Sequence, residues 1–356
     1  MTPPHIAIVG TGIIGASIGY HLAKDGARVT FLDAGEPGGI ATRASWAWIN
    51  ASWGNKKSYF NFRRRAMQEW RRLAEEVPGV GLRWPGGLIW DLPLSDLEAY
   101  AVEHGSWGYG IRRVTRGDAL AIEPGLADPP NFALHVAEEG VVEPLPATLA
   151  LLDAAKALGA RVHKAHAKRL IVHDSRAIGV AIGDGSIAAD HVVLAAGADT
   201  PRLAATAGLA IPLDTPPGLL VHSKPTARCL NGLVLAAELH MRQTAEGRLV
   251  AGSDFGGADP GDDPESTARA LFSQMATMLK NGPSLEYDFH TIGYRPTPKD
   301  GLPVIDSAPG VGGLTLAVMH SGITNAPAVG LFTAQEILKG DAAPDLAPYR
   351  LARFAR

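Results

Sequence analysis

A short glycine-rich segment near the N-terminus has the spacing of a phosphate-binding turn. The letters GTGIIG give a G-x-G-x-x-G motif over 10–15, after the apolar run 5–10 and at the start of a helical pattern. The first glycine permits a tight turn, the second lets the backbone approach a pyrophosphate, and the third lets helix and strand pack closely. The helix start offers unpaired N–H groups to phosphates. The predicted contacts with a dinucleotide are Gly10, Gly12, Ile13, Ile14 and Gly15.

An acidic residue follows at the position where such motifs bind a ribose. Asp33 ends the next strand-like run, RVTFLDAG, and Ala34 comes directly after it. A carboxylate there accepts hydrogen bonds from both ribose hydroxyls and repels a 2′-phosphate, which disfavours NADP. We predict that Asp33 and Ala34 contact the cofactor. The motif alone does not distinguish FAD from NAD.

The elements that must position this motif alternate along the chain. The strand-helix-strand order over 5–35 indicates a parallel sheet with a right-handed crossover. Residues 83–140 read as short strand-like pieces among turns, and 161–197 reads as a strand meander that ends in a buried strand. We also expect helices at 56–77, 147–160, 264–280 and 325–340, and a second β-rich zone before the last two. The α/β segments therefore alternate with two β-rich segments, which predicts two domains crossed repeatedly by the chain.

Bulk properties exclude several classes of protein. The chain has 356 residues and a net charge of -3, so no general attraction to nucleic acid is expected. No apolar run reaches the roughly 18 residues of a membrane span, and no signal peptide is recognisable. The single cysteine, Cys229, fits a reducing compartment and reads as a passive thiol, so we expect a cytoplasmic protein. No histidine or carboxylate spacing suggests a metal site.

A run of charged residues lies in the expected helix at 56–77. It is interpreted as a solvated helix face, because acids and bases alternate along it. Its members are Arg63, Arg64, Arg65, Glu69, Arg71, Arg72, Glu75 and Glu76.

Four further segments resemble one family. HVVLAAGADTPRL (191–203) and EEGVVEPLPATLALL (138–152) resemble parts of glutathione-reductase-type FAD domains. GYRPTPKDGLPVID (293–306) and MHSGITNAPAVG (319–330) resemble motifs of the D-amino acid oxidase family, which includes glycine oxidase, sarcosine oxidase and bacterial D-amino acid dehydrogenases. The resemblance spans nearly the whole chain and is least specific over 83–137. It implies FAD rather than NAD.

The resemblance also implies a fold and its division. The expected class is α/β: a glutathione-reductase-type, Rossmann-like FAD-binding domain interleaved with an α+β substrate domain on a mainly antiparallel sheet. The FAD-binding domain would comprise 1–82, 141–213 and 292–356, and the substrate-binding domain 83–140 and 214–291.

Further cofactor contacts are carried over from the family's motifs. The segment GGIATRASWAWINAS runs beneath the cofactor in the family, and His320 is expected to act mainly through its backbone, with a general base as the alternative. The implied contacts are Arg43, Ala44, Ser45, Ala196, Gly197, Arg295, His320, Ser321, Gly322, Ile323 and Thr324. Three tryptophans, Trp46, Trp48 and Trp53, lie beside this segment. We hypothesise that Trp48 forms a wall of the flavin or substrate pocket, and the alternative for all three is core or interdomain packing.

The catalytic candidates follow from the same resemblance. Arg295, in the G-x-R-P segment, would pair with a substrate carboxylate through its guanidinium fork. His240 and Arg242 are expected substrate contacts. The implied reaction oxidises the C–N bond of a small amino acid or N-substituted amino acid, passes hydride to flavin N5, and leaves an imine that hydrolyses to an oxo acid.

Departures from the family pattern leave the electron acceptor open. The cysteine or histidine that carries flavin in some branches is missing from its place, so FAD is expected without a covalent link. The lysine that sarcosine oxidases place over the flavin falls near Val250, which leaves oxygen or a quinone as acceptor. The oligomeric state is also left open by the sequence. One alternative is a flavin-binding subunit of a multi-subunit amine dehydrogenase with little activity alone; another is an NAD-dependent dehydrogenase.

Overall fold

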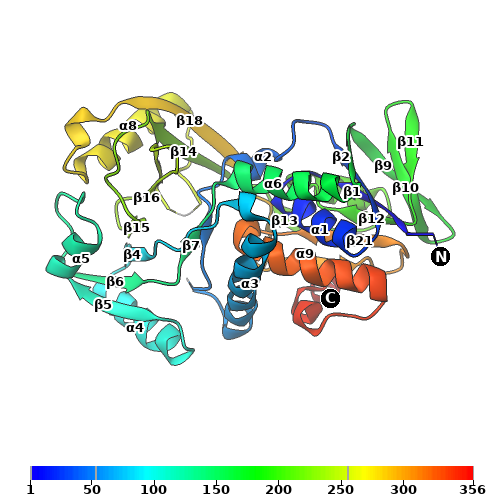
Figure 1. The fold of residues 1–356 in the computed structure, drawn as a ribbon, viewed down its shortest axis with the longest axis horizontal. Coiled ribbons are helices and arrows are strands. Elements are labelled where there is room, and N and C mark those ends of the chain that lie inside the picture. Colours follow the sequence, from blue (N-terminus) through cyan, green and yellow to red (C-terminus); the bar gives the residue numbers. More distant parts are fainter. Residues whose placement is uncertain (1, 53, 255, 356) are drawn as a thin grey trace.

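The molecule has two parts, which lie side by side in the computed structural model. The structure describes residues 2–52, 54–254 and 256–355. Figure 1 shows a parallel sheet with long helices in one part and a second sheet with shorter helices in the other. The chain passes between the parts several times, as the alternation of segments predicts.

Within the described residues, the first sheet has six strands in the order β20-β21-β12-β1-β2-β8. Its pairs are parallel except for β20 with β21 at one edge. The central strands are continuous apolar runs, since helices or a meander cover both faces. The bounds are β1 His5–Val9, β2 Arg28–Asp33, β8 Arg161–Lys164, β12 His191–Leu194, β20 Val304–Ser307 and β21 Leu314–Val318.

Long helices cover one face of this sheet. Helix α1 packs against both α6 and α9, and α3 packs against α9 (Figure 1). Their bounds are α1 Ile13–Lys24, α3 Lys57–Glu76, α6 Pro144–Ala157 and α9 Gly322–Lys339. Helix α6 begins three residues before the expected 147, with proline in its first turn.

A small antiparallel meander and short elements complete this part. The meander over 161–197 is confirmed, with β8 joining the large sheet and β12 buried. The remaining elements are β9 Ala167–His173, β10 Arg176–Ile182, β11 Gly185–Ala188, α2 Ile40–Arg43, α7 Thr200–Ala205, β13 Leu213–Asp214 with β19 Thr297–Pro298, and β3 Trp48–Ile49 with β7 Gly140–Val141. The 3-10 helices are η1 Pro78–Val80, η2 Gly197–Asp199, η3 Gly282–Ser284, η4 Pro344–Tyr349 and η5 Leu351–Phe354.

The second sheet, over the same described part of the chain, has eight strands in the order β18-β14-β17-β16-β15-β4-β6-β5. Its described pairs are antiparallel except for β15 with β4. The predicted fold class is therefore confirmed, including the mainly antiparallel second sheet, whereas the residue boundaries of the domains stay a prediction. The bounds are β4 Gly87–Trp90, β5 Ile111–Thr115, β6 Phe132–Val136, β14 Pro217–Ser223, β15 Leu233–Ala236, β16 His240–Gln243, β17 Leu249–Gly252 and β18 Tyr287–Tyr294.

The prediction for residues 83–140 was wrong about helices. Besides strands, this segment forms α4 Leu94–Ser106 and α5 Arg116–Ile122. The expected helix at 264–280 is present as α8 Pro264–Thr277 and packs near β14. Helix α5 starts at a capping box, in which Thr115 and Asp118 exchange hydrogen bonds with each other's backbone. The spacing from Thr115 to Asp118 was the available signal for a helix start.

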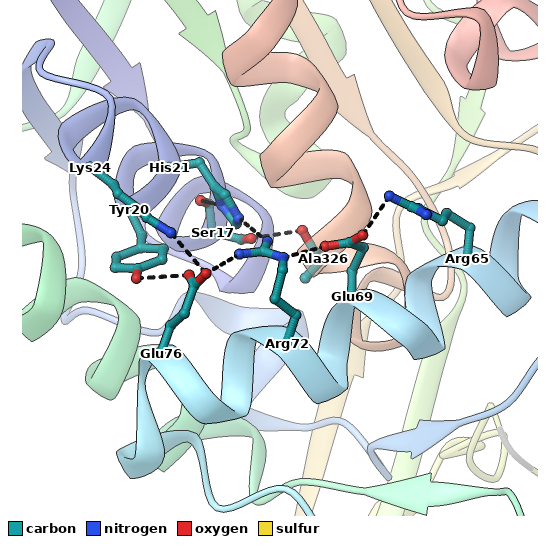
Figure 2. A network of polar contacts seen from close by, with 9 residues as sticks. All are labelled: Ser17, Tyr20, His21, Lys24, Arg65, Glu69, Arg72, Glu76 and Ala326. Carbon is teal, nitrogen blue, oxygen red and sulfur yellow. Dashed lines mark hydrogen bonds and ion pairs between the residues drawn. The ribbon is translucent and has the colours of Figure 1, made fainter.

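A polar network joins α3 to α1 (Figure 2). Arg72 forms ion pairs with Glu69 and Glu76 and donates to His21 Nε2 at 3.0 Å. His21 Nδ1 in turn donates to the Ser17 carbonyl at 2.8 Å. Burial, together with the charge of Arg72, lowers the pKa of His21 to about 4, so its ring is neutral and can accept from Arg72. This part of the charged run is an interhelix contact rather than a solvated face.

Candidate active site

One cavity of about 950 Å³ connects the glycine turn to the second sheet. The carboxyl ends of β1, β2 and β12 open into it, which is the usual ligand position in a parallel sheet. It is lined by most of the residues that the sequence singles out: Gly10, Gly12, Ile13, Ile14, Asp33, Ala34, Arg43, Ala44, Ser45, Trp46, Trp48, Ala196, Gly197, Arg295, His320, Ser321, Gly322 and Ile323. Gly15, His240, Arg242 and Thr324 are not among its described lining residues.

The glycine turn has the geometry that its motif predicts. Gly10 has φ +108°, and a Cβ there would lie 2.3 Å from the Ala195 carbonyl oxygen. A Cβ at Gly15 would lie 2.1 Å from the Gly10 carbonyl oxygen, so Gly15 serves the packing of helix on strand and does not face the cavity. Gly12 precedes α1, which directs its N-terminal turn at the cavity.

Asp33 also forms hydrogen bonds within the glycine turn, which the sequence did not predict. Its Oδ2 accepts from the backbone N–H and the hydroxyl of Thr11, at 2.8 and 2.6 Å. Its Oδ1 accepts from the Gly35 N–H at 2.9 Å. The carboxylate therefore braces the glycine turn, and Oδ1 keeps acceptor capacity toward the cavity.

These features fit a dinucleotide. The cavity begins at a glycine turn where a side chain cannot be accommodated, continues past an acid with remaining acceptor capacity, and extends to the start of a second helix, α9. The residues present therefore suit the diphosphate and ribose of FAD at one end, and the apolar walls near Trp46 and Trp48 suit a flat ring at the other.

The two described tryptophans both pack in the core and line the cavity. Trp46 and Trp48 are 3% and 8% exposed, and their rings meet edge to face at 6.0 Å. Core packing, the alternative interpretation, is thus seen for both, whereas the hypothesis that Trp48 forms a wall of the flavin or substrate pocket stays a prediction. Trp53 lies outside the described residues. Trp48 also donates through Nε1 to Glu139 at 2.8 Å.

Glu139 is a buried carboxyl that sequence reasoning missed. Burial raises its pKa to about 8, although Trp48, Tyr109 and Ser52 all donate hydrogen bonds to it. A proton on Glu139 is therefore favoured at neutral pH. Nothing in the local sequence, EEG, distinguishes this buried acid from its partly exposed neighbour Glu138.

Arg295 lies at the far end of the cavity, just after β18. It is half buried, and its Nη2 donates to the Pro217 carbonyl at 2.9 Å. Burial lowers the pKa of the guanidinium, with Asp254 acting in the opposite direction. Among the described residues Arg295 has no ion-pair partner, so the fork has capacity for an anion from the cavity.

His240 and Arg242 do not fit their predicted role as substrate contacts. Both are buried outside the cavity lining, on strand β16. His240 Nε2 meets the carboxylate of Asp91 at 3.0 Å. Arg242 donates to the Trp46 carbonyl at 2.7 Å and forms a bidentate pair with Glu143 at 3.0 and 3.1 Å. Their side chains lie on the sheet face toward Trp46, whose ring centroid is 5.8 Å from that of His240. They therefore support the tryptophan wall from behind, because Trp46 lines the cavity and they do not.

At the start of α9, Ser321 contacts an arginine that was not expected at the site. Ser321 adopts φ +57° and precedes the helix, and Thr324 donates to the Trp48 carbonyl at 3.0 Å instead of lining the cavity. Arg63, predicted on a solvated face, is only 6% exposed, lines the cavity and donates to Ser321 Oγ at 2.9 Å. Burial first, and the charges of Arg63 and Arg295, lower the pKa of His320 to about 4.

The helical spacing of α3 contained a signal for Arg63. It lies four residues after Tyr59 and seven before Trp70, and both of these aromatic residues are buried. Residues at such intervals share a helix face. The cluster of arginines concealed that one of them belongs to the apolar face.

The fold and the site define a flavin-dependent oxidoreductase, and comparisons with known proteins identify the family. The DAO family model, FAD dependent oxidoreductase, matches residues 5–336, so the chain belongs to this family. Glycine oxidase of Geobacillus kaustophilus is 28% identical over 98% of this chain and 96% of that protein. One of the subunits of the opine oxidase of Rhizobium meliloti is 27% identical over 98% of this chain and 97% of that subunit.

A solved structure agrees with this assignment. The crystal structure of glycine oxidase from Geobacillus kaustophilus superposes with a TM-score of 0.89 at 26% identity, covering 98% of this chain and 99% of that one. The chain is therefore an FAD-dependent amino acid oxidoreductase that acts on C–N bonds. No helix in the described ranges is long and apolar enough to cross a membrane.

Proposed function

We propose that this enzyme binds FAD without a covalent link and dehydrogenates the C–N bond of a small amino acid or N-substituted amino acid. The observation that carries this proposal is the continuous cavity, which joins the glycine turn at Gly10 to the guanidinium of Arg295. A cofactor bound at the turn would reach a substrate held at the arginine within the same cavity.

The chain's own residues would hold the cofactor at both ends. The N–H groups at Gly12 and Ile13 and the start of α1 suit the diphosphate, and Asp33 suits a ribose hydroxyl. The start of α9 at Ser321 and Gly322 contributes a positive helix end. When bound, FAD would accept hydride from the substrate carbon, and the resulting imine would be hydrolysed by water to an oxo acid and ammonia or an amine.

Arg295 is the proposed anchor for the substrate carboxylate. A planar fork with no ion-pair partner among the described residues is suited to bidentate binding of a carboxylate. Trp46 and Trp48 would form the wall that excludes water and orients the substrate.

The electrostatics of this end favour an uncharged amine. The same charges that lower the pKa of His320, those of Arg63 and Arg295, would also disfavour an ammonium group in the cavity. The acids that line the cavity, Asp33, Glu36 and Asp199, belong to the glycine-turn end and its neighbourhood. The proposed chemistry therefore depends on orientation and charge rather than on a strong base, and oxygen or a quinone remains the proposed acceptor.

A second candidate is supported by one comparison. The opine oxidase relative is by its name one subunit of a larger enzyme, and this chain matches nearly its full length. In that case the chain would bind FAD but turn over slowly without a partner. Co-purification of a second polypeptide that raises the rate favours this candidate.

The test is anaerobic reduction of the bound cofactor. Purified protein is mixed without oxygen with glycine, N-methyl amino acids, D-amino acids, proline analogues and N-carboxyalkyl amino acids, and the flavin absorbance is followed. Bleaching by amino acids of one of these classes is expected. Bleaching only by acids that lack an amine contradicts the proposal.

A further inference from the structure

A buried guanidinium lies where the cavity meets the start of α9. Arg63 donates from Nε to the Asn50 carbonyl at 2.9 Å and from Nη2 to Asn50 Oδ1 at 2.8 Å. Its Nη1 donates to Ser321 Oγ at 2.9 Å, and its side chain lies 5.4 Å from the ring centroid of Tyr59. These contacts use three of its five N–H groups and fix the fork against the cavity wall.

The charge of Arg63 is not matched by an ion pair. Among the described residues no carboxylate lies within 4.0 Å of its nitrogens. Glu139 interacts with it electrostatically, but burial raises the pKa of that acid to about 8, so protonation removes most of its counter-charge near pH 7. A buried, unpaired cation is costly unless an anion forms beside it. The cavity therefore favours an occupant that carries or gains negative charge.

The hydrogen bonds extend this charge to His320. Arg63 can only donate, so Ser321 Oγ accepts from it and its hydroxyl is left to donate to His320 Nδ1 at 3.0 Å. His320 then holds its proton on Nε2. Burial, with the charges of Arg63 and Arg295, lowers its pKa to about 4, so the ring is neutral. A neutral ring in one tautomer is held on the cavity wall by this chain of bonds.

We propose that Arg63 is a positioning residue that stabilises the negative charge gained by bound FAD on reduction, through its own charge and through Ser321 and His320. This rests on the proposed function, because it requires FAD in the cavity. It assigns Arg63 to the cofactor, whereas Arg295 is assigned to the substrate carboxylate. Loss of Arg63 should therefore change the reduction potential more than the KM.

The test compares three variants of the FAD-loaded protein. Arg63→Met removes the charge, and Arg63→Lys keeps it while losing the fork. Arg65→Met is the matched control, since Arg65 lies two residues away on α3, is 46% exposed in its side chain and pairs with Glu69. The midpoint potential of the bound flavin is measured during slow reduction beside a reference dye, and the KM for the best substrate is measured separately.

The expected result is a lower potential in Arg63→Met alone. Weakening the preference for reduced over oxidised FAD by at least tenfold lowers the potential by about 30 mV for this two-electron couple. Arg63→Lys and Arg65→Met should stay within that limit, with little change in KM. An unchanged potential with a raised KM in Arg63→Met overturns the proposal and assigns Arg63 to a second anionic group of the substrate.

Two further outcomes are also decisive. If Arg63→Met loses the cofactor, the midpoint potential of Arg63→Lys is compared with that of wild type instead. A potential within about 30 mV of wild type supports a role of the charge, and a potential lower by more than about 30 mV contradicts it. Wild-type protein that binds no flavin at all refutes the proposed function instead, before any variant is compared.

Discussion

Replacing Arg295 by alanine should separate substrate binding from cofactor binding. The side chain is half buried, has no ion-pair partner among the described residues and donates a hydrogen bond to the Pro217 carbonyl. Removal of one partner from a desolvated, bidentate charge pair costs about 2–4 kcal/mol. This corresponds to about a 30- to 1000-fold loss of kcat/KM. Arg295→Lys should fall between, because it keeps the charge and loses the fork.

The assay is steady-state oxidation with the best substrate of the anaerobic screen, together with the flavin content per chain. Arg113→Ala is the control, because Arg113 is exposed, pairs with Glu98 and lies outside the cavity lining. We expect full flavin content in all three variants and a raised KM only at position 295. An Arg295→Ala enzyme that saturates like wild type refutes the assignment of the substrate carboxylate to this residue.

Three further predictions concern the cofactor turn and the response to pH. Gly10→Ala should abolish FAD retention and destabilise the fold by about 1–3 kcal/mol or more, because the new Cβ meets the Ala195 carbonyl oxygen at 2.3 Å and φ is +108°. Flavin content and thermal unfolding measure this effect. A yellow, stable variant contradicts the prediction. Burial lowers the folded-state pKa of His21 to about 4, below its unfolded-state pKa of 6.5. Its contribution to the free energy of unfolding, up to about 3 kcal/mol, is therefore present above pH 6.5 and is lost as pH falls toward 4. Urea unfolding of wild type and His21→Gln over this pH range checks the prediction, and parallel pH curves would count against it. For Glu139 the sign is reversed: its folded pKa, raised to about 8 by burial, lies above the unfolded 4.5, so stability is lost as pH rises from 4.5 to 8. Glu139→Gln, which mimics the protonated form, should be the more stable protein at pH 8 and nearly equal at pH 5, and a lower stability of the variant at both pH values is the contrary result.

Local patterns were sufficient for the cofactor end of the site. The glycine turn, the strand before it and Asp33 are close together in sequence, and each residue has a steric or charge requirement that few others meet. The last helix was also predictable, because the motif over 319–330 contains its start and Gly340 ends it within the same stretch of chain. The alternation of α/β and β-rich segments was enough to predict two interleaved sheets.

Long-range contacts explain what the sequence could not provide. Arg63 meets Ser321 across 258 positions, and Arg242 meets Trp46 across 196. Whether a charged side chain of a helix or strand faces a cavity or its rear depends on how the two sheets pack, which local spacing does not determine. The amphipathic spacing of α3 gave a partial indication for Arg63. No such pattern existed for Glu139, whose three hydrogen-bond donors come from residues 48–52 and from Tyr109.

The central claim is that one cavity brings FAD at the glycine turn together with an amino acid at Arg295. A crystal structure of the protein grown with FAD and a slow carboxylate-bearing substrate analogue tests it most directly. We expect the diphosphate to lie against Gly10 and Gly12 and the analogue's carboxylate to lie on the Arg295 fork. A diphosphate bound elsewhere, or a carboxylate that leaves Arg295 without an anion, would contradict it.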